Sequence, residues 1–478
     1  MKLSIDNTLA KKITTLALPV ILGMLSQTTV NMVDAILIGH LPGATGIDGV
    51  AGIGIALPLF WAIGGFFSAI SVGTQSVTAR RIGEGLPQEA GKVLTNSLSI
   101  AVITGILVSI LGYLFIPEFF RLLNPNPNVV RLGSEFCRIR MLGVLSMVAT
   151  MSMKAFFDGI GKTYVHMTAS ITMNVINIAL NVVLVFGLWG FPRLEVAGSA
   201  WATVISTYIG LAIMIGWTLK PSIRKWYRYF RRGNLTSALS WEIIWLSVPS
   251  GLATIFVMSG FQFFLWVCGH LEPTPKVLAP LGFIPVIGPV LYNIDLLAPD
   301  LATSASSILI SFLMLIIMTS MAFGTATATL VSQSMGAKNF NLAERYGWES
   351  AKIGMYVMGL LGIIVVFKPD FFLGIFTDKQ NVIDVASAPT RLIASTTALM
   401  SAGMILVQAL YGAGNTRFVM VAELCLHALC LIPLSYLLGV SLGLGLLGIW
   451  MAAAVYVVLL SSIMALKFYE GKWKQIKL

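Results

Sequence analysis

The feature that most constrains this chain is a series of long apolar stretches that contain no Asp, Glu, Lys or Arg. A helix needs about 20 apolar residues to cross a membrane, because each residue adds only about 1.5 Å along the axis. The last stretch is long enough for two helices, separated at Gly443, Gly445 and Gly448. In chain order the stretches are 13–33, 49–79, 93–117, 163–192, 196–219, 243–271, 301–337, 353–367, 392–416 and 424–466.

A weaker candidate over 134–153 brings the predicted number of spans to twelve. Its first turns carry three charged side chains, Glu135, Arg138 and Arg140. Charges are costly inside a bilayer, so we expect these side chains to extend toward the lipid headgroups.

Composition excludes most other classes of protein. Of the 478 residues, 57% are hydrophobic and 11% are charged, whereas soluble domains are about 25% charged. A mean hydropathy of +0.87 leaves too little polar surface to cover a water-soluble globule. The net charge of +11 would indicate nucleic-acid binding only if the basic residues clustered on a folded polar surface, and here they lie in short loops. We therefore expect an all-α polytopic membrane protein with no nucleic-acid partner.

The loop charges predict the orientation of the chain. Cytoplasmic loops of membrane proteins are enriched in Lys and Arg. With a cytoplasmic N-terminus, most of the 31 Lys and Arg residues fall in cytoplasmic loops, including a dense cluster between Lys220 and Arg232. The sequence thus predicts a multi-pass protein of the plasma or bacterial inner membrane with both termini in the cytoplasm. The basic cluster is expected to lie on anionic lipid of the inner leaflet.

Short motifs recur in the same order in the two halves of the chain. LALPV at 16–20 returns as LSVPS at 246–250, and DGIGKT at 158–163 returns as YGAGNT at 411–416. Six helices per half, both starting on the same side, predict a parallel repeat with a substrate path between the halves, which is a transporter architecture. The predicted parts are an N-half at 1–219, a cytoplasmic basic linker at 220–240 and a C-half at 241–478. The C-half contains an outer insertion at 271–303, where the proline-broken apolar segment 281–294 is expected to be interfacial or re-entrant.

Several motifs together carry a resemblance to a known family. They are LPVILGMLSQTTVNMVDAILIGHL at 18–41, VGTQSVTARRIGEG at 72–85, the GIGKT turn after the fourth helix, and their echoes in the second half. In order and spacing the chain resembles the multidrug and toxic compound extrusion (MATE) family over nearly its whole length outside 271–303. The resemblance implies a V-shaped pair of six-helix lobes that exports organic, often cationic, compounds in exchange for H⁺ or Na⁺.

An acidic residue in the first span is the strongest candidate for a coupling site. Asp34 lies about two-thirds of the way along an apolar helix, where a carboxylate costs roughly 2.5–3.5 kcal/mol on insertion scales. Gln27, Asn31 and Asp34 share one helical face. Such an acid can take up a cation from one side and release it on the other, whereas the alternative is a structural hydrogen bond to a neighbouring helix.

The fifth span presents a second polar stripe. Ser170, Asn174, Asn177 and Asn181 share a face, and their amides can bind a cation or donate to Asp34. They could instead act only as interhelical hydrogen bonds. By resemblance, Asn177 and Asn181 occupy positions where one MATE branch has Asn and Asp, and Thr203 matches a Thr of that branch. The Asn at 181 removes an acid, which puts Na⁺ specificity in doubt.

The second half is poorer in charge. Another MATE branch carries a Glu in the seventh helix, whereas this chain offers Ser259 and Gln262 there. Glu423 and His427 lie at i and i+4 in the eleventh helix and could form a titrating pair or a structural one. Soft and aromatic side chains suit a polyspecific pocket, although each could equally be bulk packing. The pocket candidates are Asn174, Met173, Phe60, Trp61, Gln262, Glu423 and His427.

These observations predict a cation-coupled antiporter that works by alternating access. The expected partners are a small organic substrate and membrane lipid, with a monomeric protein and with no cofactor or resident metal besides the transported H⁺ or Na⁺. One alternative is a flippase of lipid-linked oligosaccharides, which should line its cavity with Lys and Arg. An intramembrane enzyme is a weaker alternative, because the chain has no HExxH, no GxSxG and no paired acids at catalytic spacing.

Overall fold

The computed structural model describes residues 4–39, 44–123, 126–269, 271 and 299–476. Some side chains inside these ranges, including those of Asn31 and Asp34, lie outside the described part, as does the apolar segment 281–294. The described elements are helices, with no strand among them.

The first half of the chain comprises eight helices and the second half comprises eight, with a short helix between them. In the first half these are α1 (Asn7–Gly39), α2 (Ala44–Ser68), α3 (Ile70–Gly83), α4 (Pro87–Leu123), α5 (Pro127–Leu142), α6 (Val144–Gly159), α7 (Tyr164–Phe186) and α8 (Glu195–Leu219). The short helix α9 (Pro221–Tyr227) follows. The second half contains α10 (Ser237–Gly269), α11 (Pro299–Gly336), α12 (Phe340–Phe367), α13 (Pro369–Leu373), α14 (Gln380–Gly412), α15 (Thr416–Leu426), α16 (Ile432–Tyr436) and α17 (Gly445–Glu470).

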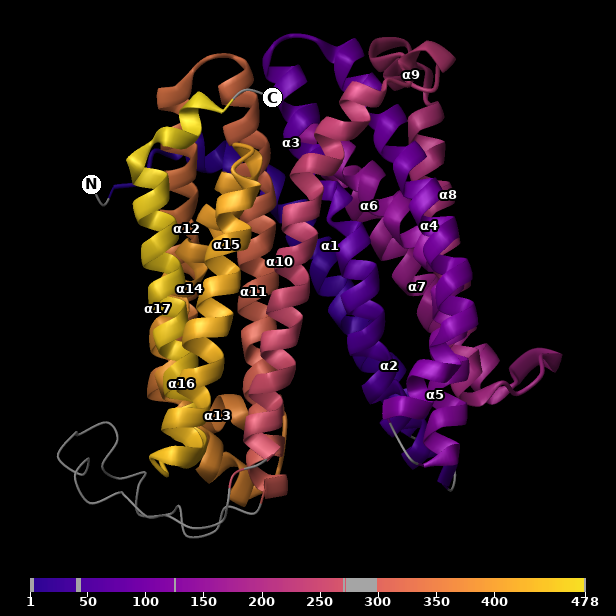
Figure 1. Ribbon diagram of the computed structural model, residues 1–478, viewed down its shortest axis with the longest axis vertical. Helices are drawn as coiled ribbons and strands as arrows, with labels where there is room; N and C mark the ends of the chain where they lie inside the picture. Colours follow the sequence, from indigo (N-terminus) through magenta and orange to yellow (C-terminus); the bar gives the residue numbers. More distant parts are fainter. Residues whose placement is uncertain (1–3, 40–43, 124–125, 270, 272–298, 477–478) are drawn as a thin grey trace.

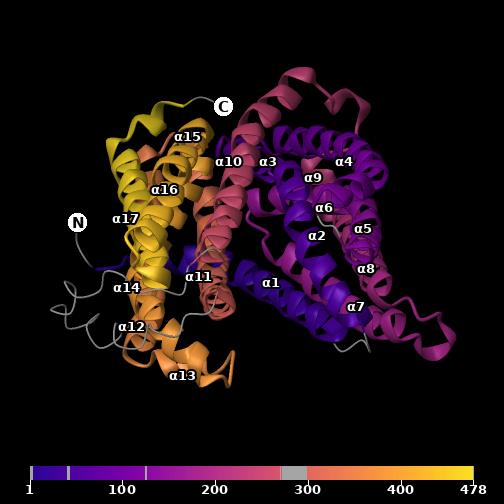
Figure 2. The ribbon, with the colours of Figure 1, turned by 60° about the horizontal axis from the view of Figure 1, so that its bottom comes forward.

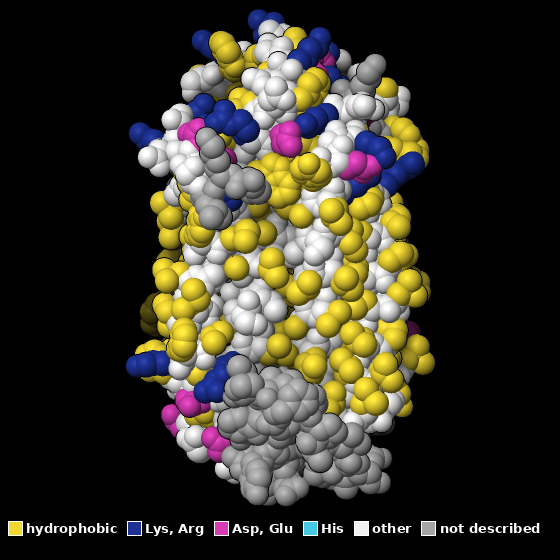
Figure 3. Space-filling view, turned by 90° about the vertical axis from the view of Figure 1, so that its left-hand side faces the viewer, with side chains coloured by type: hydrophobic (Ala, Val, Ile, Leu, Met, Phe, Trp, Pro, Cys, Tyr) yellow, Lys and Arg dark blue, Asp and Glu magenta, His cyan; other side chains and the backbone are white. Residues whose placement is uncertain are grey.

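The number of spans agrees with the sequence. In the described part, eleven helical segments are long and apolar enough to cross a membrane, and a bent pair makes a twelfth. The bent pair is α5 and α6, which meet at 45° around Gly143 and cover the weak candidate 134–153. The predicted break near residue 443 is also present, because Gly443 and Gly445 have positive φ angles between the last two spans. Apolar side chains cover the middle of the C-half face, and Lys and Arg gather toward its upper end (Figure 3).

The expectation that Arg140 extends to the headgroups is wrong. Its side chain is buried, with the guanidinium 4.6 Å from the centre of the Phe60 ring and 5.8 Å from that of Phe136. Arg138 also contacts a neighbouring helix. Its Nε donates to the Tyr113 carbonyl, and its guanidinium lies 4.2 Å from the centre of the Tyr113 ring. Aromatic faces compensate a cation for part of its lost hydration, so these arginines need not reach the headgroups.

The two halves form separate bundles that adjoin at one end and diverge toward the other (Figure 1). Helices α1 and α10 lie where the bundles meet, with α1 beside α11 and α10 beside α3 (Figures 1 and 2). Leu9, Ile13 and Ala17 of α1 are buried in a core cluster formed mostly by the C-half. The first helix therefore belongs to both bundles at its start, although it begins the N-half in sequence.

The start of α1 is fixed by an acidic cap. Asp6 Oδ1 accepts hydrogen bonds from the backbone N–H groups of Thr8 (2.9 Å) and Leu9 (3.2 Å). These N–H groups hold the pKa of Asp6 below its usual range. The other carboxyl oxygen pairs with Arg345 of α12 at 2.7 Å, so the cap also ties the chain start to the C-half.

The joined end is built by a pseudo-symmetric set of hydrogen bonds, which we call the inter-half seam. Ser76 Oγ donates to the Tyr411 carbonyl at 2.8 Å, and Thr329 Oγ1 donates to the Asp158 carbonyl at 3.0 Å. Each residue of the second bond lies 253 positions from its counterpart in the first, the same offset that relates the motifs at 158–163 and 411–416. The sequence repeat is thus also a symmetry of the contact between the halves.

Two further bonds of the seam come from the repeat-equivalent donors Arg80 and Gln333, and their acceptors differ by one position in the repeat. Arg80 Nη2 donates to the Ala413 carbonyl at 3.4 Å, and Gln333 Nε2 donates to the Gly159 carbonyl at 2.8 Å. Gln75 Nε2 donates two further bonds of 2.8 Å, to the Thr325 carbonyl and to Thr329 Oγ1. The repeat has no equivalent of these bonds, because the position that corresponds to Gln75 is Ala328. The seam therefore joins the ends of α3 and α6 in the N-half to those of α11 and α14 in the C-half.

Glycine makes the close approach of α3 and α11 possible. A methyl group on Gly83 would overlap the carbonyl oxygen of Gln333, and one on Gly336 would overlap the carbonyl oxygen of Arg80. Gly83 and Gly336 are themselves repeat-equivalent, as are the two residues that they face. Any larger residue at either position would force the two backbones apart.

Candidate functional site

The predicted coupling set begins on α1, where the structure describes only part of it. The backbone at Asn31 and Asp34 is helical, and their side chains lie outside the described residues. Gln27 is half-buried on the same helix. The preceding Ser26 connects α1 to α7, because Asn174 Nδ2 donates to Ser26 Oγ at 2.7 Å.

The predicted stripe on α7 is a buried polar face. Asn174, Asn177 and Asn181 are each at most 4% exposed, and Ser170 is also buried. Side chains four residues apart lie on the same face of a helix, which explains why one stripe enters the protein while Val175 and Ile171 remain exposed. Burying three amides in an apolar bundle is favourable only when their polar atoms find partners.

The partners of these amides lie mainly on α8 and on α7 itself. Asn177 Nδ2 donates to Thr203 Oγ1 (3.3 Å) and Ser206 Oγ (3.2 Å), and Asn181 Nδ2 donates to Asn177 Oδ1 (2.9 Å). We call this group the N-half polar cluster; its members are Asn174, Asn177, Asn181, Thr203 and Ser206. The structure thus brings together four predicted site residues, and adds Ser206, which lies one turn after Thr203. Among described residues, Asn174 Oδ1 is buried without a hydrogen-bond partner, so this oxygen can accept one.

The predicted pocket residues do not form one group. Phe60 is buried against Arg140, while the adjacent Trp61 is 40% exposed and packs edge-on against Phe60. Met173 packs at the α7–α8 contact, where Gly210 leaves room for its sulfur, and Gln262 is exposed on α10. Whether these residues contact a substrate stays a prediction.

Glu423 and His427 lie together inside the C-half. Both are buried, and His427 Nδ1 lies 3.5 Å from Glu423 Oε2. Tyr456 of α17 donates from its hydroxyl to the same carboxyl oxygen at 2.8 Å. No motif in the sequence points to Tyr456, because it lies 33 positions after Glu423, on a different helix.

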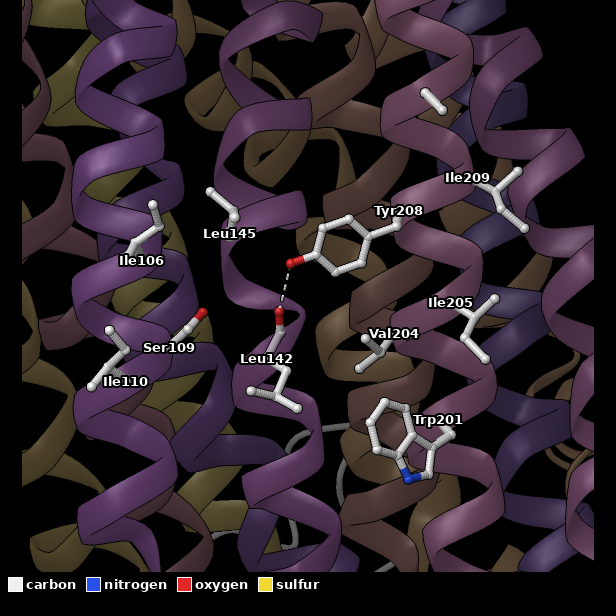
Figure 4. Close-up of a pocket in the computed structure, with 11 residues that line it drawn as sticks. Ile106, Ser109, Ile110, Leu142, Leu145, Trp201, Val204, Ile205, Tyr208 and Ile209 are labelled. Carbon is white, nitrogen blue, oxygen red and sulfur yellow. Dashed lines mark hydrogen bonds between the residues drawn. The ribbon is translucent and has the colours of Figure 1, made fainter. Parts of the chain in front are cut away.

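A cavity of ≈ 620 Å³ lies outside both groups, on the surface of the N-half (Figure 4). Its walls come from α4, α8 and the bend between α5 and α6, and are mostly Ile, Leu and Val. Tyr208 donates to the Leu142 carbonyl at 3.0 Å, which satisfies a backbone group exposed by the bend. Ile106, Ile110 and Ile205 remain exposed, so this hollow faces where lipid chains would lie rather than the contact between the halves.

Within the described residues, no three His, Cys, Asp or Glu residues gather closely enough to hold a metal ion. The polar groups of the two clusters are amides, hydroxyls and a carboxyl–imidazole pair.

The chain is similar in sequence to a known family and to several named proteins. The MatE family profile matches residues 19–183 and 290–437. "Probable multidrug resistance protein NorM" of Thermotoga maritima is 24% identical over 474 residues, which cover 97% of this chain and 93% of the relative. "Probable multidrug resistance protein YoeA" of Bacillus subtilis is 22% identical over 466 residues, covering 96% and 92%.

Solved structures share the fold. A MOP superfamily transporter from Pyrococcus furiosus superimposes with a TM-score of 0.84 at 20% identity, over 96% of this chain and 95% of the other. The outward-facing conformation of a multidrug resistance MATE family transporter gives a TM-score of 0.81 at 20% identity, over 97% and 96%. Because the MatE family profile matches more than half of its residues, this multi-pass membrane protein belongs to the MatE family of transporters.

Proposed function

We propose that this protein exports small organic compounds, cations among them, in exchange for H⁺ or Na⁺. The observation that carries the proposal is the arrangement of two halves with six candidate spans each, joined at one end, in a chain that belongs to a transporter family. Relatives named as multidrug resistance proteins support the substrate class. A protein that alternates between two openings needs such a reversible contact at one end.

The proposed orientation puts the inter-half seam on the cytoplasmic side. The basic α9 region and the last described residue, Ile476, lie at the same end as the seam, and Ile476 accepts a hydrogen bond from Arg80 Nη1 at 3.2 Å. The Lys and Arg bias of this end favours the cytoplasm. The structure then corresponds to a state that is closed toward the cytoplasm, from which substrate leaves outward.

Coupling is assigned to Asp34 and the N-half polar cluster. Asp34 follows Ser26 by eight residues on α1, and Ser26 is bonded to Asn174 of the cluster. The carboxyl group of Asp34 either holds a cation or is empty. Binding and release of the cation change the charge of the carboxyl, and this in turn changes the hydrogen bonds that α1 can make with α7. When cation and cationic substrate compete for one region, each weakens binding of the other, which is antiport in terms of linkage.

The contribution of the polar cluster can be tested at Asn177. We expect Asn177→Ala to lower cation-driven substrate uptake about tenfold, because Thr203 and Ser206 lose their shared donor. The effect on stability should be small, since interhelical hydrogen bonds in membranes average about 0.6 kcal/mol. Thermal unfolding in detergent and uptake into vesicles measure the two effects separately.

Thr172→Ala is the matched control for Asn177→Ala. Thr172 lies on the exposed face of the same helix and bonds only within it, to the Thr168 carbonyl. This control should transport normally. Wild-type uptake by Asn177→Ala would mean that the cluster serves packing alone.

The central experiment for the proposed function is uptake of a fluorescent organic cation into proteoliposomes. We expect an imposed pH or sodium gradient to drive uptake against the substrate gradient, and the ion that does so identifies the coupling ion. Uptake that follows only the substrate's own gradient would contradict the proposal, because coupling requires that the ion gradient perform work.

A flippase of lipid-linked oligosaccharides, whose pyrophosphate is anionic, is the second candidate. Buried Arg140 beside Phe60 is the observation that favours it, since a guanidinium binds phosphate well. The same vesicles distinguish the two functions: scrambling or flipping of a labelled anionic lipid, with no transport of organic cations, would select the flippase.

A further inference from the structure

A buried acid–imidazole–phenol group occupies the C-half. Glu423 is 6% exposed and His427 is 3% exposed, and the Tyr456 hydroxyl donates to Glu423 Oε2 at 2.8 Å. The His427 ring lies 4.8 Å from the Tyr456 ring, in an edge-on arrangement. We call Glu423, His427 and Tyr456 the C-half triad. Such a group is costly to bury, so its presence in an apolar bundle calls for an explanation beyond packing.

The sequence repeat places this triad at the counterpart of the N-half polar cluster. With the offset of 253 positions that relates the two sides of the seam, Glu423 corresponds to Ser170 and His427 to Asn174. In the last span of each half the offset is 250, because Gly448 and Gly198 both pack against a carbonyl at the end of the preceding span, so Tyr456 corresponds to Ser206 of the cluster. Both halves therefore bury a polar group between their fifth and sixth spans. In the C-half, the amides and hydroxyls are replaced by groups that can exchange a proton.

Among the described residues, the helices packed against the triad bring it no charged partner beyond its own His427. The recorded ion pair of Glu423 is with His427, and Arg417, six residues before Glu423, lies over the Trp245 ring instead. From α14, the buried Tyr411 phenol faces Glu423, and from α10, Ser250 lies against Tyr411.

Other neighbours of the triad are neutral. Gly260 of α10 packs directly on His427 and offers no titrating group, and Cys430 lies near Tyr456. In the described part, the group facing the Glu423 carboxylate that can carry positive charge is thus His427. A proton is the simplest cation that such a closed space can hold.

Backbone geometry also marks this position. His427 begins a π-helical turn that continues to Leu431, between α15 and α16. Its Nδ1 lies 2.8 Å from the Glu423 carbonyl, which helps to fix the ring. Inserted π turns are frequent at functional sites because they displace a side chain from its regular helical position.

We propose that the C-half triad is a second proton-binding site, at which Glu423 takes up the proton. One proton passes from water to a carboxylate oxygen of Glu423, which changes the charge of the carboxyl from −1 to 0 while Tyr456 keeps its hydroxyl hydrogen. His427 positions the carboxyl and can share the proton. The proposal rests on the proposed function, because a proton site matters here as part of cation-coupled export.

The triad also lies next to the inter-half seam. Tyr411, whose side chain faces Glu423, accepts the hydrogen bond of Ser76 at its carbonyl. Glu423 is seven residues from the seam-proximal end of its span, Thr416, or about 10 Å along the axis. Tyr411 alone therefore separates the proton site on Glu423 from the Ser76–Tyr411 hydrogen bond, which joins the two halves.

The test measures proton binding without transport. We expect an infrared difference spectrum of the full-length protein in nanodiscs, recorded between acidic and neutral pH, to contain the carbonyl stretch of a buried protonated carboxyl. Glu423→Gln should remove the share of this band that Glu423 contributes, and any share from Asp34 should remain. Glu118→Gln should leave it unchanged, because Glu118 is an exposed partner of Arg121. Persistence of the complete band in Glu423→Gln would overturn the proposal.

A second variant keeps the test valid if Glu423→Gln does not fold. Tyr456→Phe removes only the hydroxyl that donates to Glu423, and we expect it to shift the frequency of the same band. An unshifted band would contradict the assignment. Failure of the proposed function has a different signature, namely wild-type vesicles that show no ion-driven uptake whatever the infrared spectrum contains.

Discussion

We expect Asp34→Asn to abolish drug efflux while the protein still inserts into the membrane. Asparagine has nearly the shape of aspartate but stays neutral, so it cannot alternate between a charged and a neutralised state. Insertion should not suffer, because a neutral amide is less costly in an apolar helix than a carboxylate. Resistance of drug-hypersensitive cells, compared at equal membrane abundance, measures the effect.

A surface acid provides the control for this variant. Asp384→Asn alters an exposed carboxyl on α14 whose recorded partner is the Gln380 amide four residues earlier, and it should give normal resistance. Normal resistance from Asp34→Asn itself would remove Asp34 from the mechanism. The two-halved fold would be unaffected by that result, since it does not depend on this side chain.

Substitution of either seam glycine should be nearly as damaging. Gly83→Ala and Gly336→Ala place a methyl group against the backbone carbonyl of Gln333 or Arg80, so α3 and α11 must separate. The neighbouring bonds from Ser76, Thr329 and Gln333 then lengthen or break. We expect efflux to fall about tenfold or more, because the state closed at this end becomes unfavourable by at least 1.4 kcal/mol.

The chain offers a matched glycine for comparison. A methyl group on Gly216 of α8 would meet no atom within 4 Å, so Gly216→Ala should keep full efflux. Alanine should even favour that helix by about 1 kcal/mol. Accessibility of a cysteine placed in the seam, probed with a membrane-impermeant reagent, shows whether the seam has opened. Normal efflux and an unchanged seam in both Gly83→Ala and Gly336→Ala would contradict this role.

The architecture was predictable because it follows from the length and polarity of single segments. Charge-free stretches indicate eleven spans, the charged segment 134–153 supplies the twelfth, and the glycines near residue 443 indicate the break between the last two. The repeated motifs at 158–163 and 411–416 pointed to two equivalent halves. They could not show that the carbonyls within these motifs accept hydrogen bonds across the seam, because those contacts join residues more than 150 positions apart.

Polar positions were predictable only where one helix carries the whole pattern. The face of α7 could be read from a spacing of four residues, and its amides are buried as that spacing indicates. Partners on other helices, such as Ser26 and Tyr456, leave no local pattern. The burial of Arg140 could not be predicted for a related reason, since the aromatic rings around its guanidinium are brought together only by packing.

The central claim is that movement of substrate and of a cation are coupled in opposite directions. Coupling free energy is reciprocal, so a substrate gradient must be able to move the cation. The direct measurement uses vesicles with no initial ion gradient, an imposed gradient of organic cation, and internal pH and sodium indicators. The account predicts that wild-type protein moves H⁺ or Na⁺ opposite to the substrate and that Asp34→Asn does not. Substrate movement through the wild-type protein with neither indicator responding would contradict it.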